Sequence, residues 1–133
     1  MAWRSLLSAV RNAPANATIK ISGEIKATIS SGNNGEIVIN KNLTIKGKTG
    51  AGSDKLNAIT LSRIFKVKTG NTLTLENITL TGGKASGTEE AANGGGILVK
   101  EGGKAELKNC TVKACEAAEK GGGIYSLGEV TLD

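Results

Sequence analysis

The 133-residue chain contains few aromatic residues, one proline and no histidine. Its three aromatic side chains are Trp3, Phe65 and Tyr125, so a core must be built mainly from Ile, Leu, Val and Ala. So few aromatics provide no stacking platform for single-stranded nucleic acid, and we predict no nucleic-acid partner. The single proline, Pro14, together with 19 glycines, favours many tight turns between short, regular strands.

Metal-binding residues are equally scarce. Without histidine, the two cysteines, Cys110 and Cys115, cannot complete a zinc site. The pair could form a disulfide, or each thiol could act as a small apolar side chain at a packed position, which is the interpretation we favour. Carboxylates do not recur as a cluster at the repeat spacing, and the only aspartates are Asp54 and Asp133. We therefore predict no catalytic residues, no metal and no cofactor.

No apolar run in the sequence is long enough to span a membrane. Near the N-terminus, the apolar run at residues 5–10 is shorter than the ~7–15 residues of a signal-peptide core. A helix over residues 3–13, ended by Pro14, explains this segment better, because its apolar residues fall on one helical face. These residues, at positions i, i+3, i+4 and i+7, are Trp3, Leu6, Leu7 and Val10.

The chain is basic, with a net charge of +5 from 17 basic and 12 acidic residues. Such a balance suits nucleic acid, an anionic membrane surface or an acidic polysaccharide. The lysines are scattered from Lys20 to Lys120 and form no run, which is typical of a solvated lysine-rich face. Contact of these lysines with the carboxylates or sulfates of a polysaccharide is the alternative interpretation.

Internal repeats organise the sequence. Three segments share an Asn-x-Thr motif followed by an apolar residue, at steps of 35 and 32 residues: Asn42–Ile45, Asn77–Leu80 and Asn109–Val112. At the 32-residue step the match extends to Phe65 with Ile97, Val67 with Val99, Leu73 with Ala105, Leu75 with Leu107 and Leu80 with Val112. A glycine triplet followed by isoleucine also repeats after 27 residues, first as Gly94, Gly95 and Gly96 and then as Gly121, Gly122 and Gly123.

Within each repeat the apolar residues alternate with polar ones, as expected of strands with one buried face. Each repeat holds about three strands, which can bury their apolar faces only by coiling and stacking on the next repeat. We therefore predict an all-β fold, a right-handed parallel β-helix (solenoid) of about four coils. Residues 1–133 form one domain, with a capping helix at residues 3–13, stacked coils at residues 18–133, and loops outside the coil at residues 27–36, 49–62 and 82–93.

The repeated asparagines and glycines are expected to have structural roles. Asparagine tolerates the left-handed conformation and can hydrogen-bond across a bend, so Asn42, Asn77 and Asn109 are predicted to stack as a ladder. The two glycine triplets are predicted to mark corners that require positive φ or a close approach of two backbones.

The last repeat breaks off early. Residues 130–132 echo residues 105–107, and Asp133 then occupies the position of Lys108. Because solenoids need covered ends, we expect an incomplete last coil in a fragment of a longer protein. Alternatively, another chain covers this end, for example through end-to-end self-association.

These motifs resemble those of the pectin-lyase-like β-helices, most closely bacterial surface proteins of the polymorphic outer-membrane type. The resemblance covers nearly the whole chain and is carried by the helix at Trp3–Val10, by TIKISGEI at Thr18–Ile25, and by the NLTIKG, NITLTGG and GGGI repeats. Chlamydial members carry a Phe-x-x-Asn motif beside the glycine triplet, where this chain has Leu75-Glu76-Asn77 and Leu107-Lys108-Asn109.

The resemblance implies an exported passenger, displayed on the bacterial cell surface or secreted. It implies a non-enzymatic scaffold that acts in adhesion by binding a host or matrix protein or glycan. The alternative function is a carbohydrate-binding or polysaccharide-lyase-like β-helix that acts on acidic polysaccharide.

Overall fold

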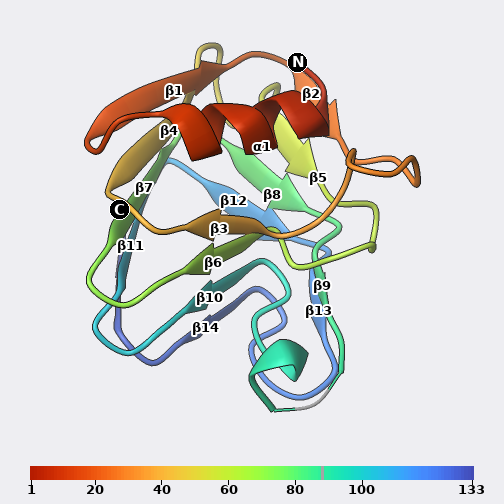
Figure 1. Ribbon diagram of the computed structural model, residues 1–133, viewed down its shortest axis with the longest axis vertical. Coiled ribbons are helices and arrows are strands. Elements are labelled where there is room, and N and C mark those ends of the chain that lie inside the picture. Colours follow the sequence, from red (N-terminus) through yellow and green to blue (C-terminus); the bar gives the residue numbers. More distant parts are fainter. Residues whose placement is uncertain (88) are drawn as a thin grey trace.

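The strands of the chain are all parallel to their neighbours and wind into a β-solenoid of about four turns (Figure 1). The computed structural model describes residues 1–87 and 89–133. Successive turns stack so that each strand lies beside its equivalent in the next turn. The predicted parallel solenoid is therefore confirmed, while its right-handed sense stays a prediction.

The longest sheet, sheet A, contains one strand from every turn in the order β1-β4-β7-β11-β15. Its strands are β1 (Ala17–Ile21), β4 (Leu43–Gly47), β7 (Thr72–Glu76), β11 (Lys104–Lys108) and β15 (Glu129–Leu132). Burial alternates along β4, β7 and β11, because successive side chains point to opposite faces of a sheet. One face of sheet A therefore packs into the core and the other faces solvent.

Two four-stranded sheets and one two-stranded sheet complete the walls. Sheet B consists of β2 (Glu24–Lys26), β5 (Lys55–Asn57), β8 (Thr79–Thr81) and β12 (Thr111–Lys113). Sheet C consists of β3 (Ile37–Ile39), β6 (Phe65–Val67), β10 (Ile97–Val99) and β14 (Ile124–Ser126). Sheet D consists of β9 (Lys84–Ala85) and β13 (Glu116–Ala117), and a 3-10 helix, η1 (Glu89–Ala92), precedes β10.

The strand register confirms the 32-residue and 27-residue steps of the sequence. Phe65 pairs with Ile97, and Leu73 with Ala105, at the 32-residue step. Ile97 pairs with Ile124 at the 27-residue step. The echo of residues 105–107 in residues 130–132 is also a true strand pairing between β11 and β15.

The predicted 35-residue step from Asn42 to Asn77 is wrong. Leu43 pairs with Leu73, so the step between these turns is 30 residues and Asn42 stands opposite Thr72. The Asn-x-Thr motif occurs at two different corners, before a strand of sheet A in one turn and after it in the next two. Alternation has the same period in every strand, so it cannot distinguish one wall of the coil from another.

Two of the predicted loops contain strands. Residues 49–62 include β5, which lies between β2 and β8 in sheet B. Residues 82–93 include β9 and η1. Strand β5 carries a single buried apolar residue, Leu56, and is too short for alternation to reveal it.

The core is an aliphatic column inside the coil, as the composition predicted. Phe65 is the one aromatic residue on the strands that is fully buried, and it is surrounded by Ile, Leu, Val and Ala side chains from all the turns. At the N-terminal end, helix α1 (Trp3–Asn12) lies across the stack (Figure 1) and buries Trp3, Leu6 and Val10. The predicted capping helix is therefore confirmed, with Leu7 only partly buried.

Side-chain hydrogen bonds hold α1 on the stack. The indole Nε1 of Trp3 donates to the carbonyl oxygen of Gly35 at 2.9 Å. At the other end of the helix, the Nζ of Lys41 donates to the carbonyl oxygens of Arg11 at 3.0 Å and Ala13 at 2.8 Å. These carbonyls belong to the last turn, where a helix has no acceptor-satisfying partners of its own. The cap is thus tied to the loop before β3 and to the turn after it.

The opposite end of the stack is less covered. Val112, Ile124 and Val130 pack against the core there but are only partly buried. Leu127 and Leu132 are 54% and 69% exposed.

Candidate functional site

Two of the three predicted ladder asparagines lie together. The side-chain Nδ2 of Asn109 donates to Oδ1 of Asn77 at 2.8 Å, across adjacent turns. Both residues follow a strand of sheet A and have left-handed φ angles, 56° for Asn77 and 51° for Asn109. Asn42 lies before its strand instead, and its Oδ1 accepts a hydrogen bond from the backbone N–H of Thr72 at 2.8 Å. Asn42 therefore serves a different corner from the other two asparagines.

The predicted corner glycines stack closely upon one another. The backbone N–H of Gly96 donates to the carbonyl oxygen of Gly123 at 2.9 Å. A Cβ atom on Gly95 would lie 2.1 Å from the carbonyl oxygen of Glu116, and one on Gly96 would lie 2.6 Å from that of Gly123. Gly121 also requires its own φ of 64°. Glycine is needed at this corner because no side chain fits between the turns.

Gly94 and Gly122 complete the two triplets. Gly94 has a φ of 68°, and its N–H donates to the carbonyl oxygen of Lys120 at 2.9 Å. A Cβ on Gly122 would meet the carbonyl oxygen of Cys115 at 3.1 Å, which is tight but less severe. The triplets therefore position β10 and β14 and present their backbone to each other.

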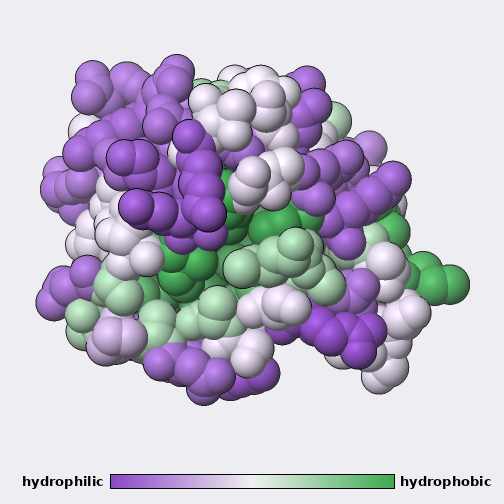
Figure 2. All heavy atoms as spheres, turned by 90° about the horizontal axis from the view of Figure 1, so that it is seen from above, coloured by the Kyte–Doolittle hydropathy of each residue, from purple (hydrophilic) through white to green (hydrophobic). Residues whose placement is uncertain are grey.

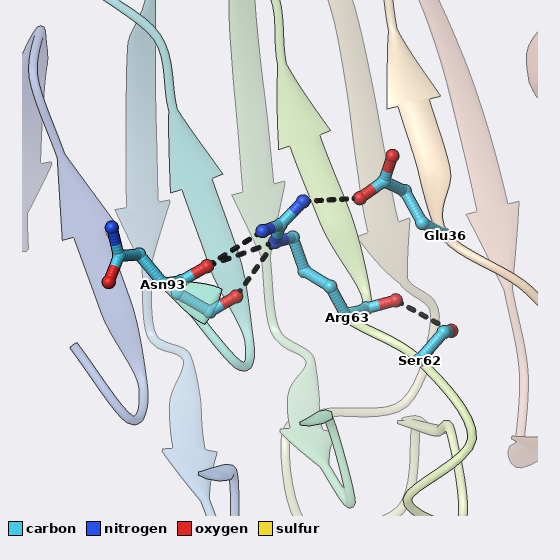
Figure 3. Close-up of polar contacts among 5 residues, drawn as sticks. Glu36, Ser62, Arg63 and Asn93 are labelled. Carbon is cyan, nitrogen blue, oxygen red and sulfur yellow. Dashed lines mark hydrogen bonds and ion pairs between the residues drawn. The ribbon is translucent and has the colours of Figure 1, made fainter. Parts of the chain in front are cut away.

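Sequence reasoning did not identify Arg63, which carries the most extensive polar network of the described residues (Figure 3). Its side chain is only 7% exposed. The guanidinium donates from Nη2 to the carbonyl oxygen of Asn93 at 2.8 Å and from Nε to that of Gly94 at 3.0 Å. Its Nη1 lies 2.5 Å from Oε2 of Glu36. One side chain thus joins three successive turns.

The same column of polar contacts reaches the fourth turn. Oδ1 of Asn93 accepts a hydrogen bond from the backbone N–H of Lys120 at 3.1 Å. Glu36, Arg63, Asn93 and Lys120 all stand just before strands of sheet C. Their spacing matches the turn lengths, but their residue types differ, so no repeated motif draws attention to them.

Asp54 is a second buried polar centre. Its carboxylate is fully buried and accepts backbone N–H bonds from Gly23 at 2.8 Å, Thr49 at 2.6 Å and Gly50 at 2.8 Å. The hydrogen bond from Gly50 is the main cause that lowers the pKa of Asp54, and burial opposes it. This carboxylate holds the loop before β5 against the turn before β2.

The cysteines are free thiols on the less covered half of the stack. Cys110 and Cys115 are both half-buried and pack against the core, in agreement with the packed interpretation. Burial raises the pKa of both thiols. Among the described residues, no group of three or more Cys, Asp or Glu side chains comes together in a way that could hold a metal ion.

A basic pocket lies on the outer surface beside sheet C. We call it the lysine pocket; it has a volume of about 400 Å³ and is lined by Lys66, Lys68, Thr69, Asn71 and Lys100. Val67 pairs with Val99, which places Lys68 beside Lys100 on adjacent turns. Stacking therefore gathers lysines that are far apart in the sequence.

A second hollow of about 440 Å³ separates α1 from β3 and is lined by Leu7, Val10, Arg11, Glu36, Ile37, Val38, Asn40 and Lys41. Figure 2 views the end of the stack that α1 covers, where apolar residues near the middle are bordered by hydrophilic ones. This hollow contains charges of both signs, whereas the lysine pocket contains basic and neutral side chains only.

No protein-family model, curated protein or solved structure matches this chain in comparisons with known proteins. No helix within residues 1–87 and 89–133 combines the length and the apolar character that a bilayer-spanning helix requires.

Proposed function

We propose that this chain is a non-enzymatic binding scaffold, a pectin-lyase-like β-helix that resembles the passengers of polymorphic outer-membrane proteins. It would be displayed on a bacterial cell surface or secreted, and would bind a host or matrix protein or glycan in adhesion. The parallel solenoid supports this proposal, because stacked turns create a long and regular outer surface on which side chains from distant segments meet.

The single observation that carries the proposal is the placement of the polar groups. The deeply buried ones join the turns: Arg63 meets Glu36 and two carbonyl oxygens, and Asp54 accepts three backbone N–H groups. A carboxylate with a lowered pKa and three donors is a poor general acid or base at neutral pH. The lysines of the outer surface, by contrast, face solvent and can meet a ligand.

The experiment has two parts and uses the 133-residue chain. Intact source cells are treated with protease, and the loss of the protein is followed with an antibody raised against the chain. The purified chain is then tested for binding to immobilised matrix proteins, matrix glycans and host cells. Removal by protease together with saturable binding is expected. A protected intracellular product, or no binding to any of these surfaces, would overturn the proposal.

A carbohydrate-active protein is the second candidate, and the lysine pocket favours it. Lysine ammonium groups can meet the carboxylates of a uronic-acid polymer. A lyase assay that follows the absorbance of the unsaturated product separates the two candidates. Turnover by the wild-type chain would overturn the non-enzymatic proposal, and binding without turnover would support it.

The proposed partners include a second copy of this chain, through the less covered end that carries β15. Leu127 and Leu132 are exposed there, and β15 is an edge strand of sheet A. Edge strands with exposed apolar residues readily pair with another chain.

A further inference from the structure

We propose that the lysine pocket is a subsite for an anionic polysaccharide, whose sulfate or carboxylate groups bind Lys66, Lys68 and Lys100. The assignment rests on the proposed function, since it names the ligand class that the scaffold would recognise.

The register of sheet C brings two lysines side by side. Strands β6 and β10 are adjacent, and Val67 pairs with Val99, so Lys68 and Lys100 leave neighbouring strands at equivalent positions. Neighbouring strands are about 4.8 Å apart. Like charges directly opposite each other destabilise a sheet, and an anion between them offsets that repulsion. Such a pair is therefore a favourable place for a sulfate or carboxylate.

The composition of sheet C makes this position different from other lysine rows. Its strands, IVI, FKV, ILV and IYS, contain no acidic residue. On sheet A, Lys20 and Lys46 are likewise stacked, but Lys46 is paired in register with Glu76 on the next strand. Lys104 forms ion pairs with Glu106 at 3.1 Å and Glu129 at 3.7 Å. The rows of sheet A therefore contain their own counter-charges.

The lysine pocket also has an ordered floor. The turn after β6 is held by hydrogen bonds from Gly70 N–H to the carbonyl oxygen of Gly102 at 3.1 Å and from Asn71 N–H to that of Lys68 at 3.2 Å. The hydroxyl of Thr69 donates to the carbonyl oxygen of Glu101 at 2.8 Å. The lone pairs of that hydroxyl face outward chemistry as acceptors for a sugar hydroxyl. A preorganised floor lowers the cost of ordering on binding.

The size and chemistry of the pocket favour a polysaccharide over a nucleic acid. Its volume of about 400 Å³ lies in the range of small-ligand sites, which suits one or two sugar units of a longer polymer. None of its lining residues is aromatic, so it offers no surface on which bases could stack. Lys66 and Lys100 have other interactions in the folded chain, and an incoming anion would compete with these contacts.

The test compares two double variants of the full chain. Lys68→Gln/Lys100→Gln alters the pocket, and Lys20→Gln/Lys46→Gln is the matched control. Each pair consists of one exposed and one half-buried lysine on adjacent strands, and each variant removes two positive charges. Dissociation constants are measured for fluorescent heparin oligosaccharides, oligogalacturonates and a single-stranded DNA oligonucleotide of equal charge. The first two ligands separate sulfate from carboxylate recognition.

We expect Lys68→Gln/Lys100→Gln to raise the Kd for at least one of the two glycans by about tenfold or more. The control is expected to change it by less than about threefold. The amide resonances of Thr69 and Gly70 should shift when that glycan is added to the wild-type chain. Equal losses in both variants, absence of these shifts, or equally tight binding of DNA would overturn the assignment.

The proposed function can fail separately from the lysine pocket. If the wild-type chain binds matrix or cells and Lys68→Gln/Lys100→Gln binds them equally well, the pocket assignment is wrong and the scaffold function stands. If the wild-type chain binds the free glycan through the pocket but neither matrix nor cells, the pocket stands and the adhesion proposal is wrong.

Discussion

Arg63 provides the sharpest test of how the turns are held together. Replacing it with alanine removes the donors that satisfy the carbonyl oxygens of Asn93 and Gly94, both of which are buried residues. A buried acceptor left without a donor costs about 1–3 kcal/mol. The loss of packing around the aliphatic stem adds to this cost, while Glu36 can reach solvent because its side chain is 29% exposed. We expect Arg63→Ala to lower the free energy of unfolding by about 3–5 kcal/mol.

The magnitude is large compared with the stability of a domain of this size. Typical domains have unfolding free energies of about 5–15 kcal/mol. For a chain of this length, the expected loss corresponds to a decrease in Tm of roughly 10–20 °C. Urea unfolding followed by circular dichroism gives the free energy directly, and an unchanged m-value would show that the native and unfolded states expose similar areas as before.

Two further variants show which contact matters. Arg63→Lys keeps the charge but loses the planar fork, so it should still cost about 2 kcal/mol. Glu36→Gln removes the partly exposed charge and keeps an acceptor, so it should cost less than about 1 kcal/mol. If Glu36→Gln destabilised the chain as much as Arg63→Ala, the ion pair would dominate. The argument from the two carbonyl oxygens would then be refuted.

Three other outcomes test the glycines, Asp54 and the exposed end. Gly95→Ala should cost more than about 2 kcal/mol because its Cβ would lie 2.1 Å from the carbonyl oxygen of Glu116, whereas Gly52→Ala, with open space around it, should stay within about 0.5 kcal/mol in thermal unfolding. Since the pKa of Asp54 is lowered in the folded chain, its carboxylate stabilises the fold above about pH 4, and this contribution is lost as the pH falls through the folded pKa. The stability difference between wild type and Asp54→Asn should therefore shrink in urea titrations from pH 7 to acid, and a constant difference would contradict this account. Leu132→Glu should abolish concentration-dependent dimers in sedimentation velocity, and a wild-type chain that stays monomeric at high concentration would count against the end-to-end contact.

The wall strands could be predicted from sequence where their apolar residues repeat at the turn length. Phe65 and Ile97, or Leu73 and Ala105, occupy the same inward position in adjacent turns, so self-alignment finds them. Asn42 was placed in the wrong corner because a short Asn-x-Thr motif recurs at more than one position of the coil. Register is decided by which residues are buried together, and in that turn Leu43 pairs with Leu73.

The polar centres could not be predicted because their partners are backbone atoms of other turns. Arg63 binds carbonyl oxygens, and Asp54 binds N–H groups, which every residue except proline possesses. Their partners therefore leave no trace in residue type. The lysine pocket was hidden for a different reason, since Lys68 and Lys100 become neighbours only through the stacking of β6 on β10. A basic composition alone indicated a surface of this kind without locating it.

The unequal ends of the stack give the molecule a direction of unzipping. Helix α1 and Arg63 tie together the first three turns, while Val112, Ile124 and Val130 of the last turn are only partly covered. In a solenoid each turn depends mainly on its nearest neighbours, so local opening begins where a turn has a neighbour on one side only. Amide protons should accordingly exchange with solvent in a gradient, fastest on β15 and slowest near the strands beneath the helix. A partner that settled on the β15 end would slow exchange along the whole column, and so act as a brake on unfolding at a distance from its own contacts.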